Sequence, residues 1–96
     1  MTRLFARYFW GSVMLVCTII NTALADQKII IQSTTSTKNS GLYDYILPLM
    51  KQDTGVTAHV VAVGTGAAIK NAMNCDGDVL LVHSRKREEK FVAEGY

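Results

Sequence analysis

The chain has 96 residues, of which 49% are hydrophobic and 19% charged, with seven glycines and a single proline. This length excludes a multidomain enzyme, and the composition excludes disordered, collagen-like and low-complexity chains. The net charge of +2 comes from Arg3 and Arg7, because residues 26–96 carry eight basic and eight acidic side chains. A segment without net charge lacks the basic face that nucleic-acid binding requires, so we expect no nucleic-acid partner.

Residues 1–25 have the pattern of a signal peptide. A basic start precedes an apolar stretch from Phe9 to Ile20, and Ala23-Leu24-Ala25 follows. This stretch is short for a bilayer core of about 30 Å, which disfavours a retained membrane anchor. Cys17 follows a branched residue rather than a small one, which disfavours a lipoprotein. We therefore expect cleavage after Ala25 and a periplasmic or secreted mature segment.

Beyond this leader, apolar runs alternate with segments of helical spacing. Continuous apolar or β-branched runs are typical of strands in a parallel sheet covered on both faces, and they predict strands over Lys28–Gln32, Val56–Val63 and Asp78–Val82. The spacing of apolar residues predicts helices from Leu42 to about Asp53, from Ala67 to about Met73 and from about Arg87 to Glu94. Pro48 is expected to bend or split the first helix, and Thr54-Gly55 to end it.

Three strands alternating with three helices are typical of βαβ units with parallel strands. We predict an α/β fold with a three-stranded parallel sheet in the chain order βαβαβα, forming one domain over residues 26–96. No terminating element follows the last helix, which indicates a truncated architecture.

The polar loops after the three strands form the candidate binding site. The carboxyl ends of parallel strands meet at one edge of the sheet, where the helices that follow present unpaired N–H groups. The loop Ser33–Gly41 holds six hydroxyl side chains and no carboxylate, Gly64-Thr65-Gly66 forms the second loop, and His83-Ser84 begins the third. Because helix amino termini and neighbouring hydroxyls donate hydrogen bonds to anions, the sequence predicts an oxyanion cradle.

The lack of acidic side chains in the first two loops bears on the kind of anion. A protonated phosphate needs an acceptor for its hydrogen, whereas a fully deprotonated tetrahedral anion needs donors alone. This favours sulfate-like or metal oxyanions, although Glu88 or Glu89 weakens the preference. The hydroxyl-rich loop is equally compatible with a solvated turn held by local capping bonds, and the G-T-G turn with close backbone packing.

Other kinds of site find little support in the pattern. The G-T-G turn lacks the third glycine of a dinucleotide fingerprint, because Ile69 stands there, and no Walker loop is present. No pair of His, Cys, Asp or Glu has metal-site spacing, so we expect no metal and no cofactor. His59 is expected to be a strand residue, whereas His83 is either a site residue or ties down its loop. Ser36 and Ser84 lack the context of a nucleophile, so no catalytic residue is predicted.

Four segments recur together in one known family. They are S-T-T-S-T-K-N-S-G-L-Y-D-Y-I-L-P from Ser33, V-V-A-V-G-T-G-A-A-I-K from Val60, D-V-L-L-V-H from Asp78, and E-E-K-F-V-A-E-G-Y from Glu88. In this order and at this spacing they resemble the periplasmic substrate-binding proteins of tungstate-type ABC importers. The resemblance covers nearly the whole mature segment.

This resemblance implies a lobe of the type II periplasmic-binding-protein fold. Two such lobes close over a tetrahedral oxyanion, tungstate or molybdate, and present it to an ABC permease in the inner membrane. The family's first loop reads T-T-T-S, which implies anion contacts in this chain from Ser33, Thr34, Thr35 and Ser36. The G-T-G turn adds Gly64, Thr65 and Gly66 to the ligand-binding set, with His83 and Ser84 as further candidates.

The sequence departs from the family in two respects. Arg85 and Arg87 stand in the third loop, where smaller or neutral residues are common. Family members are also much longer, with a second lobe after the segment that matches, so we expect an amino-terminal portion. Half of a clamp cannot close around its ligand, and we expect it to bind an oxyanion weakly on its own.

Two alternatives remain open on the sequence alone. One is a small secreted α/β enzyme acting on a phosphorylated or sulfated compound, which would need a general acid or base aimed at the same edge. The other is a non-functional product of a truncated gene. Hydrolytic activity that is lost with His83 would favour the enzyme.

Overall fold

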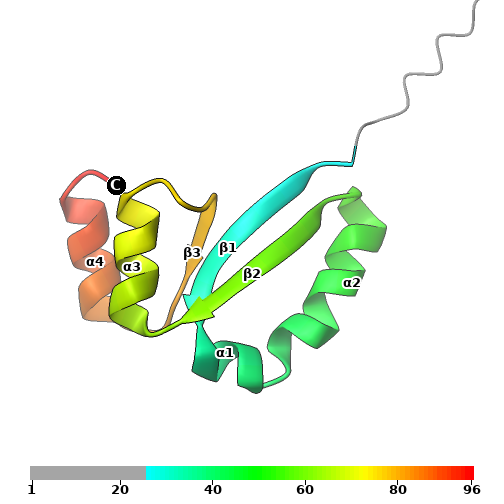
Figure 1. Ribbon diagram of the computed structural model, residues 1–96, viewed down its shortest axis with the longest axis horizontal. Coiled ribbons are helices and arrows are strands. Elements are labelled where there is room, and N and C mark those ends of the chain that lie inside the picture. Colours follow the sequence, from blue (N-terminus) through cyan, green and yellow to red (C-terminus); the bar gives the residue numbers. More distant parts are fainter. Residues whose placement is uncertain (1–25) are drawn as a thin grey trace, which may run out of the picture.

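A computed structural model describes residues 26–96, in which strands and helices alternate (Figure 1). The expected leader at residues 1–25 lies outside the described residues. In chain order the elements are β1 (Lys28–Thr34), α1 (Thr35–Asn39), α2 (Leu42–Thr54), β2 (Thr57–Val63), α3 (Thr65–Met73), β3 (Val79–Leu81) and α4 (Arg85–Ala93).

The three strands form one parallel sheet in the order β2-β1-β3. β1 pairs with β2 from Lys28 opposite Thr57 to Thr34 opposite Val63. The short β3 pairs with the far end of β1, where Ser33 stands opposite Leu81. In Figure 1, α2 lies on one side of the sheet and α3 and α4 on the other. The predicted α/β fold with a three-stranded parallel sheet is confirmed.

Gln32 and Ser33 show how β1 joins the two helical layers. Successive side chains of a strand point to opposite faces, and both of these residues are buried. Ser33 Oγ contacts the hydroxyl of Tyr43 in α2 at 2.5 Å. On the other face, Gln32 Oε1 accepts a hydrogen bond of 3.1 Å from Asn71 Nδ2 in α3. The polar end of β1 therefore fixes one helix on each side of the sheet.

The burial of β1 differs from the prediction. The run K-I-I-I-Q was expected to be covered on both faces, yet Lys28 and Ile30 are exposed and only Ile31 of the three isoleucines is buried. Full burial instead extends from Ile31 to Thr34. The reason is that β3 covers only the carboxyl half of β1, so the amino half of the strand has a neighbour on one side alone.

The helices also depart from their predicted limits. α1 was expected to be part of a loop, α3 starts at Thr65 rather than Ala67, and α4 starts two residues early. α2 is one helix, so Pro48 does not split it. Proline removes the hydrogen bond to the carbonyl four residues earlier, here that of Asp44, and both residues are exposed. As predicted, α2 ends at Gly55, which has a φ of 73°.

The turn before β3 is held against β1. Gln32 Nε2 donates to the carbonyl of Asp76 at 2.8 Å. The N–H of Ile30 donates to Asp78 Oδ2, and the N–H of Asp78 donates to the carbonyl of Ile30, each at 2.8 Å. Gly77 lies so close that an added Cβ would approach Gln32 Cγ to 2.7 Å. These contacts set the register in which β3 meets β1.

The apolar core is small. Its buried members are Ile31, Tyr43, Ala68, Ile69 and Val82. The last three form one cluster, and four half-buried side chains pack against it: Val63, Met73, Leu80 and Phe91. A short chain has little interior relative to its surface, and several large apolar side chains, among them Tyr45 and Val92, are exposed.

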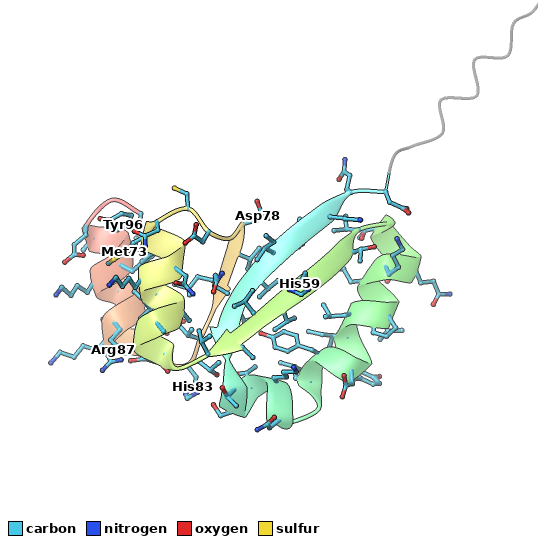
Figure 2. The ribbon with its side chains drawn as sticks, viewed as in Figure 1. His59, Met73, Asp78, His83, Arg87 and Tyr96 are labelled. Atoms are coloured by element: carbon cyan, nitrogen blue, oxygen red, sulfur yellow. The ribbon has the colours of Figure 1, made fainter. Side chains whose placement is uncertain are left out.

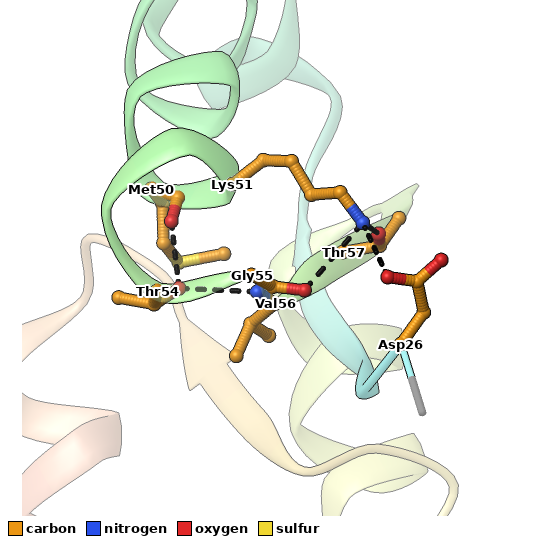
Figure 3. A network of polar contacts seen from close by, with 7 residues as sticks. All are labelled: Asp26, Met50, Lys51, Thr54, Gly55, Val56 and Thr57. Carbon is orange, nitrogen blue, oxygen red and sulfur yellow. Dashed lines mark hydrogen bonds and ion pairs between the residues drawn. The ribbon is translucent and has the colours of Figure 1, made fainter. Parts of the chain in front are cut away.

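A polar network links the amino ends of β1 and β2 to the end of α2 (Figure 3). Lys51 Nζ donates to Thr57 Oγ1 at 2.7 Å and approaches Asp26 Oδ1 to 3.3 Å. Thr54 Oγ1 donates to the carbonyl of Met50 at 2.6 Å. This network lies at the edge of the sheet opposite the candidate site and includes none of the predicted site residues.

Candidate functional site

The three polar loops meet at the carboxyl edge of the sheet. Because Thr34 stands opposite Val63 and Ser33 opposite Leu81, the three strands end at the same level. The loops that follow them contain Thr35, Thr65 and His83. In Figure 1, α1 and the first turn of α3 lie at this edge, and Figure 2 shows His83 there as well. The topology therefore gathers the predicted donors at one edge.

Thr34 organises the first loop. It is the N-cap of α1, with extended backbone (φ −111°, ψ 152°), and its Oγ1 accepts a hydrogen bond of 3.2 Å from the N–H of Thr37. The same Oγ1 lies 2.7 Å from Thr37 Oγ1 and 3.1 Å from Ser36 Oγ. Thr34 is buried, whereas Thr35 and Ser36 are exposed. Of the hydroxyls predicted to face an anion, those of Thr35 and Ser36 are thus the accessible ones.

Ser33, whose hydroxyl was predicted to contact the anion, lies beneath the first loop. Its side chain is fully buried. Ser33 Oγ donates its hydrogen to the carbonyl of Leu81 at 2.8 Å, and it therefore accepts from the hydroxyl of Tyr43. A serine hydroxyl has one hydrogen, so none remains for an anion. Ser33 instead joins β1, β3 and α2 under the first loop.

The second loop supplies main-chain donors. Gly64 is the N-cap of α3, in extended backbone, and its carbonyl accepts from the N–H of Ala68 at 2.9 Å. The first N–H groups of a helix have no partner within it, and the helix dipole makes this end attractive to anions. The first turn of α3 holds no acidic residue. Thr65 is half-buried and Gly66 exposed, so this donor set is open to a ligand.

His83 ties the third loop to the first. Its exposed ring places Nε2 at 2.9 Å from Ser36 Oγ. Ser84 is the N-cap of α4 but makes no side-chain cap bond, and Glu88 stands in the first turn of this helix. His83 was expected either to belong to the site or to fix its loop by a hydrogen bond. The arrangement agrees with both, because the exposed ring lies at the carboxyl edge and contacts Ser36 of the first loop.

Arg87 is a neighbour of the site that is not among the predicted ligand-binding residues. A Cβ built on Gly66 would lie 3.8 Å from Arg87 Nη1, so this guanidinium reaches the amino terminus of α3. Figure 2 shows Arg87 at the same end of the molecule as His83. Arg87 was expected in the third loop, and its approach to Gly66 was not predicted, because β3 lies between the two residues in the chain. A cation there adds positive potential for an anion.

Three hollows lie on the described part of the chain. Two of about 390 Å³ lie between α2 and β2 and beside β3 and the end of α4. A third, of about 340 Å³, lies between α3 and α4, and Gly66 and Arg87 are among its lining residues. Within residues 26–96, no helix is long and apolar enough to cross a membrane. In the same part of the chain, no three His, Cys, Asp or Glu side chains are grouped as a metal site would require.

Similar sequences come from tungstate-binding proteins. The tungstate-binding protein TupA of Peptoclostridium acidaminophilum is 55% identical over 71 residues, which cover 74% of this chain and 25% of the relative. The protein of the same name from Campylobacter jejuni is 50% identical over 61 residues, which cover 64% and 23%. The chain thus spans about a quarter of the length of the curated relatives it matches.

Solved structures agree with the sequence match. The tungstate-binding protein TupA from Desulfovibrio alaskensis G20 has a TM-score of 0.72 at 44% identity, over 73% of this chain and 28% of that one. The structure of the tungstate ABC transporter from Geobacter sulfurreducens has a TM-score of 0.71 at 44% identity, over 75% and 31%. The profile of the PBP superfamily domain matches residues 21–96. The chain therefore belongs to the PBP superfamily, as its resemblance to periplasmic binding proteins implied.

Proposed function

We propose that this chain supplies one lobe of an oxyanion-binding site, with tungstate as the ligand, and that it works as a solute-binding component of an ABC importer. The observation that carries the proposal is the convergence of three acid-poor loops at one edge of a parallel sheet. Two relatives at 50% identity or more are named for tungstate binding, which supports this choice of anion. Molybdate, with the same shape and charge, is the second ligand in the proposal.

The donors fall into two groups. The hydroxyls of Thr35 and Ser36, with Thr34 holding their loop, serve one side of the anion. Main-chain N–H groups at Gly64-Thr65-Gly66 serve the other, and a helix amino terminus suits them to this role. Ser84 and the guanidinium of Arg87 stand at the rim. Hydrogen bonds from such donors to an anion are shorter and stronger than neutral ones.

The matched relatives are about four times as long as the matching segment. We propose that donors from a second lobe complete the site in the family, and that closure of the two lobes supplies most of the affinity. On this account the chain alone binds tungstate with a dissociation constant weaker than about 1 μM. Isothermal titration that finds submicromolar binding would contradict this part of the proposal.

Export is the second part of the proposal. We propose that residues 1–25 are a signal peptide removed after Ala25, that the protein works in the periplasm, and that it delivers its anion to a permease in the inner membrane. Expression in a bacterial host followed by mass spectrometry of the periplasmic fraction tests this. A product that begins at Asp26 is expected, and a product that retains residues 1–25 would contradict the proposal.

The enzyme alternative has one contact in its favour, the pair of Ser36 and His83. A serine nucleophile needs a base that a third group orients. Within residues 26–96, no carboxylate forms an ion pair or hydrogen bond with His83. We therefore propose binding and not hydrolysis, and an assay of the purified chain with chromogenic phosphate and sulfate esters is expected to show no turnover.

The binding test is a nuclear magnetic resonance titration of the ¹⁵N-labelled chain with sodium tungstate at millimolar concentrations. The amide signals of Thr35 and Gly66 are expected to shift, and those around Lys51 to stay in place. Thr35→Val removes a hydroxyl of the proposed donor set and Thr57→Val removes one at the opposite edge, so only the first is expected to weaken the response at Gly66. Equal responses of the two variants, or shifts confined to the Lys51 network, would refute the placement of the site.

A further inference from the structure

Ser36 and His83 belong to different loops and meet in a contact that the proposed donor set does not explain. Ser36 Oγ lies 2.9 Å from His83 Nε2 and 3.1 Å from Thr34 Oγ1. Thr34 Oγ1 in turn lies 2.7 Å from Thr37 Oγ1. The four side chains form a continuous hydrogen-bonded row across the first and third loops, with the ring of His83 at its exposed end.

The direction of the bond between Ser36 and His83 decides what else Ser36 can do. A serine hydroxyl carries a single hydrogen. A neutral ring with its hydrogen on Nδ1 accepts at Nε2, and Ser36 then gives that hydrogen to the ring. A protonated ring carries hydrogen on both nitrogens and donates to Ser36 instead. The hydrogen of Ser36 is then released from the ring, and an anion on the exposed side of the loop can take it in competition with Thr34 Oγ1.

We propose that His83 positions the donor hydrogen of Ser36, so that protonation of His83 turns Ser36 toward the oxyanion and strengthens anion binding at acid pH. This inference rests on the proposed function and adds a control of the same site. His83 acts through Ser36 and through its own charge, so it is a positioning residue. The switch needs no movement of the backbone, because only a hydrogen changes place.

Several ionisable side chains belong to the elements that meet near His83. β1 and β3 have no ionisable side chain at their carboxyl ends, and α3 has none in its first turn. The ionisable side chains of the neighbouring helices are Lys38 in α1, Tyr43, Asp44, Tyr45, Lys51 and Asp53 in α2, Lys70 in α3, and Arg85, Lys86, Arg87, Glu88, Glu89 and Lys90 in α4. Histidine is the side chain that ordinarily changes charge between about pH 5 and 8.

His59 provides a matched control for this proposal. It lies on β2 and lines the hollow between α2 and β2 together with Lys38 and Asp44. Figure 2 shows it midway along the sheet, whereas His83 lies at the carboxyl edge. A change in the charge of His59 therefore does not reach Ser36, although both histidines are exposed.

The test compares tungstate affinity at about pH 5.5 and about pH 8, on either side of the ordinary histidine pKa of about 6.5. The full chain, His83→Gln and His59→Gln are titrated, with the amide signals of Thr35 and Gly66 as the readout. One hydrogen bond to a charged group changes affinity by about tenfold, so the unaltered chain and His59→Gln are expected to bind about tenfold more weakly at the higher pH. His83→Gln carries an amide that can donate at any pH and is expected to bind equally at both.

The imidazole ¹⁵N signals of the anion-free chain give a second readout, because they show which ring nitrogen of His83 carries the hydrogen. A purely structural role of His83 would not make this depend on Ser36. At about pH 8 the inference expects Nε2 of His83 to be the acceptor nitrogen, with a signal that changes in Ser36→Ala. A hydrogen on Nε2 at this pH would overturn the inference, as would a pH dependence that persists in His83→Gln.

The outcomes also separate the inference from the function beneath it. Tungstate shifts at Thr35 and Gly66 that are the same at both pH values overturn the role of His83 alone. Absence of these shifts in every variant at both pH values refutes the oxyanion site itself, and the inference with it.

Discussion

Replacement of Ser33 by alanine tests whether the buried end of β1 supports the site from below. Ser33 is fully buried, and its hydroxyl joins the carbonyl of Leu81 at 2.8 Å to the hydroxyl of Tyr43 at 2.5 Å. Ser33→Ala leaves both partners without this bond, the hydroxyl of Tyr43 at a buried position and the carbonyl of Leu81 at a partly buried one. A buried polar group left unpaired costs about 1–3 kcal/mol, so the loss of two partners predicts about 2–4 kcal/mol.

Tyr43→Phe is the comparison that separates these contributions. It removes the phenol hydroxyl but leaves Ser33 bonded to Leu81, so about 0.5–1.5 kcal/mol is expected. The double variant should lose less than the sum of the single variants, since the pair is then removed together. For a mature segment of this size the total free energy of unfolding is only about 4–10 kcal/mol, so Ser33→Ala removes a large part of it.

Urea unfolding followed by circular dichroism measures these values in the full chain and its variants. Ser33→Ala is expected to lower the free energy of unfolding more than Tyr43→Phe. The double variant is expected to lose less than the sum of the two. A loss below about 0.5 kcal/mol for Ser33→Ala, within the range of ordinary surface substitutions, would refute the assignment of this hydroxyl to the interior. It would leave the hydroxyl available for an anion.

Two further predictions concern other parts of the fold. Gly77→Ala places a Cβ about 2.7 Å from Gln32 Cγ. Because Gln32 is buried and both ends of its amide are hydrogen-bonded, overpacking is expected to destabilise the chain by about 1–3 kcal/mol. A thermal midpoint equal to that of the unaltered chain would contradict this, since it would show that the turn before β3 moves to accept the methyl group. Lys51→Met removes the contacts with Asp26 and Thr57 drawn in Figure 3, and because these side chains are exposed the expected loss is below about 1 kcal/mol; a larger loss in urea unfolding would contradict this.

The sheet could be predicted because its signal is local. Continuous apolar runs indicated three strands, and the helical segments between them required the strands to be parallel. Because the carboxyl ends of parallel strands meet at one edge of a sheet, the sequence also predicted that the three loops lie together. Gly55 and Gly64 marked a helix end and a helix start close to where the structure has them.

The remaining features depend on partners distant in the sequence. α1 has no buried residue and no apolar spacing that would indicate a helix. Its one sequence signal is a threonine at position 34, a residue type that often caps the amino end of a helix. Ser33 reads as a loop residue because its partners in α2 and β3 appear only on folding. The approach of Arg87 to Gly66 and of His83 to Ser36 likewise joins residues that no spacing rule connects.

The most direct test of the oxyanion site is an anomalous difference map from crystals of the full chain soaked with sodium tungstate. Tungsten scatters strongly, so its position can be read without assumptions about the surrounding side chains. The proposal predicts a peak at the carboxyl edge of the sheet, with its oxygens within hydrogen-bond distance of the loops at Thr35-Ser36 and Thr65-Gly66. A peak beside the Lys51 network or in the hollow between α2 and β2, or no peak at millimolar tungstate, would contradict it.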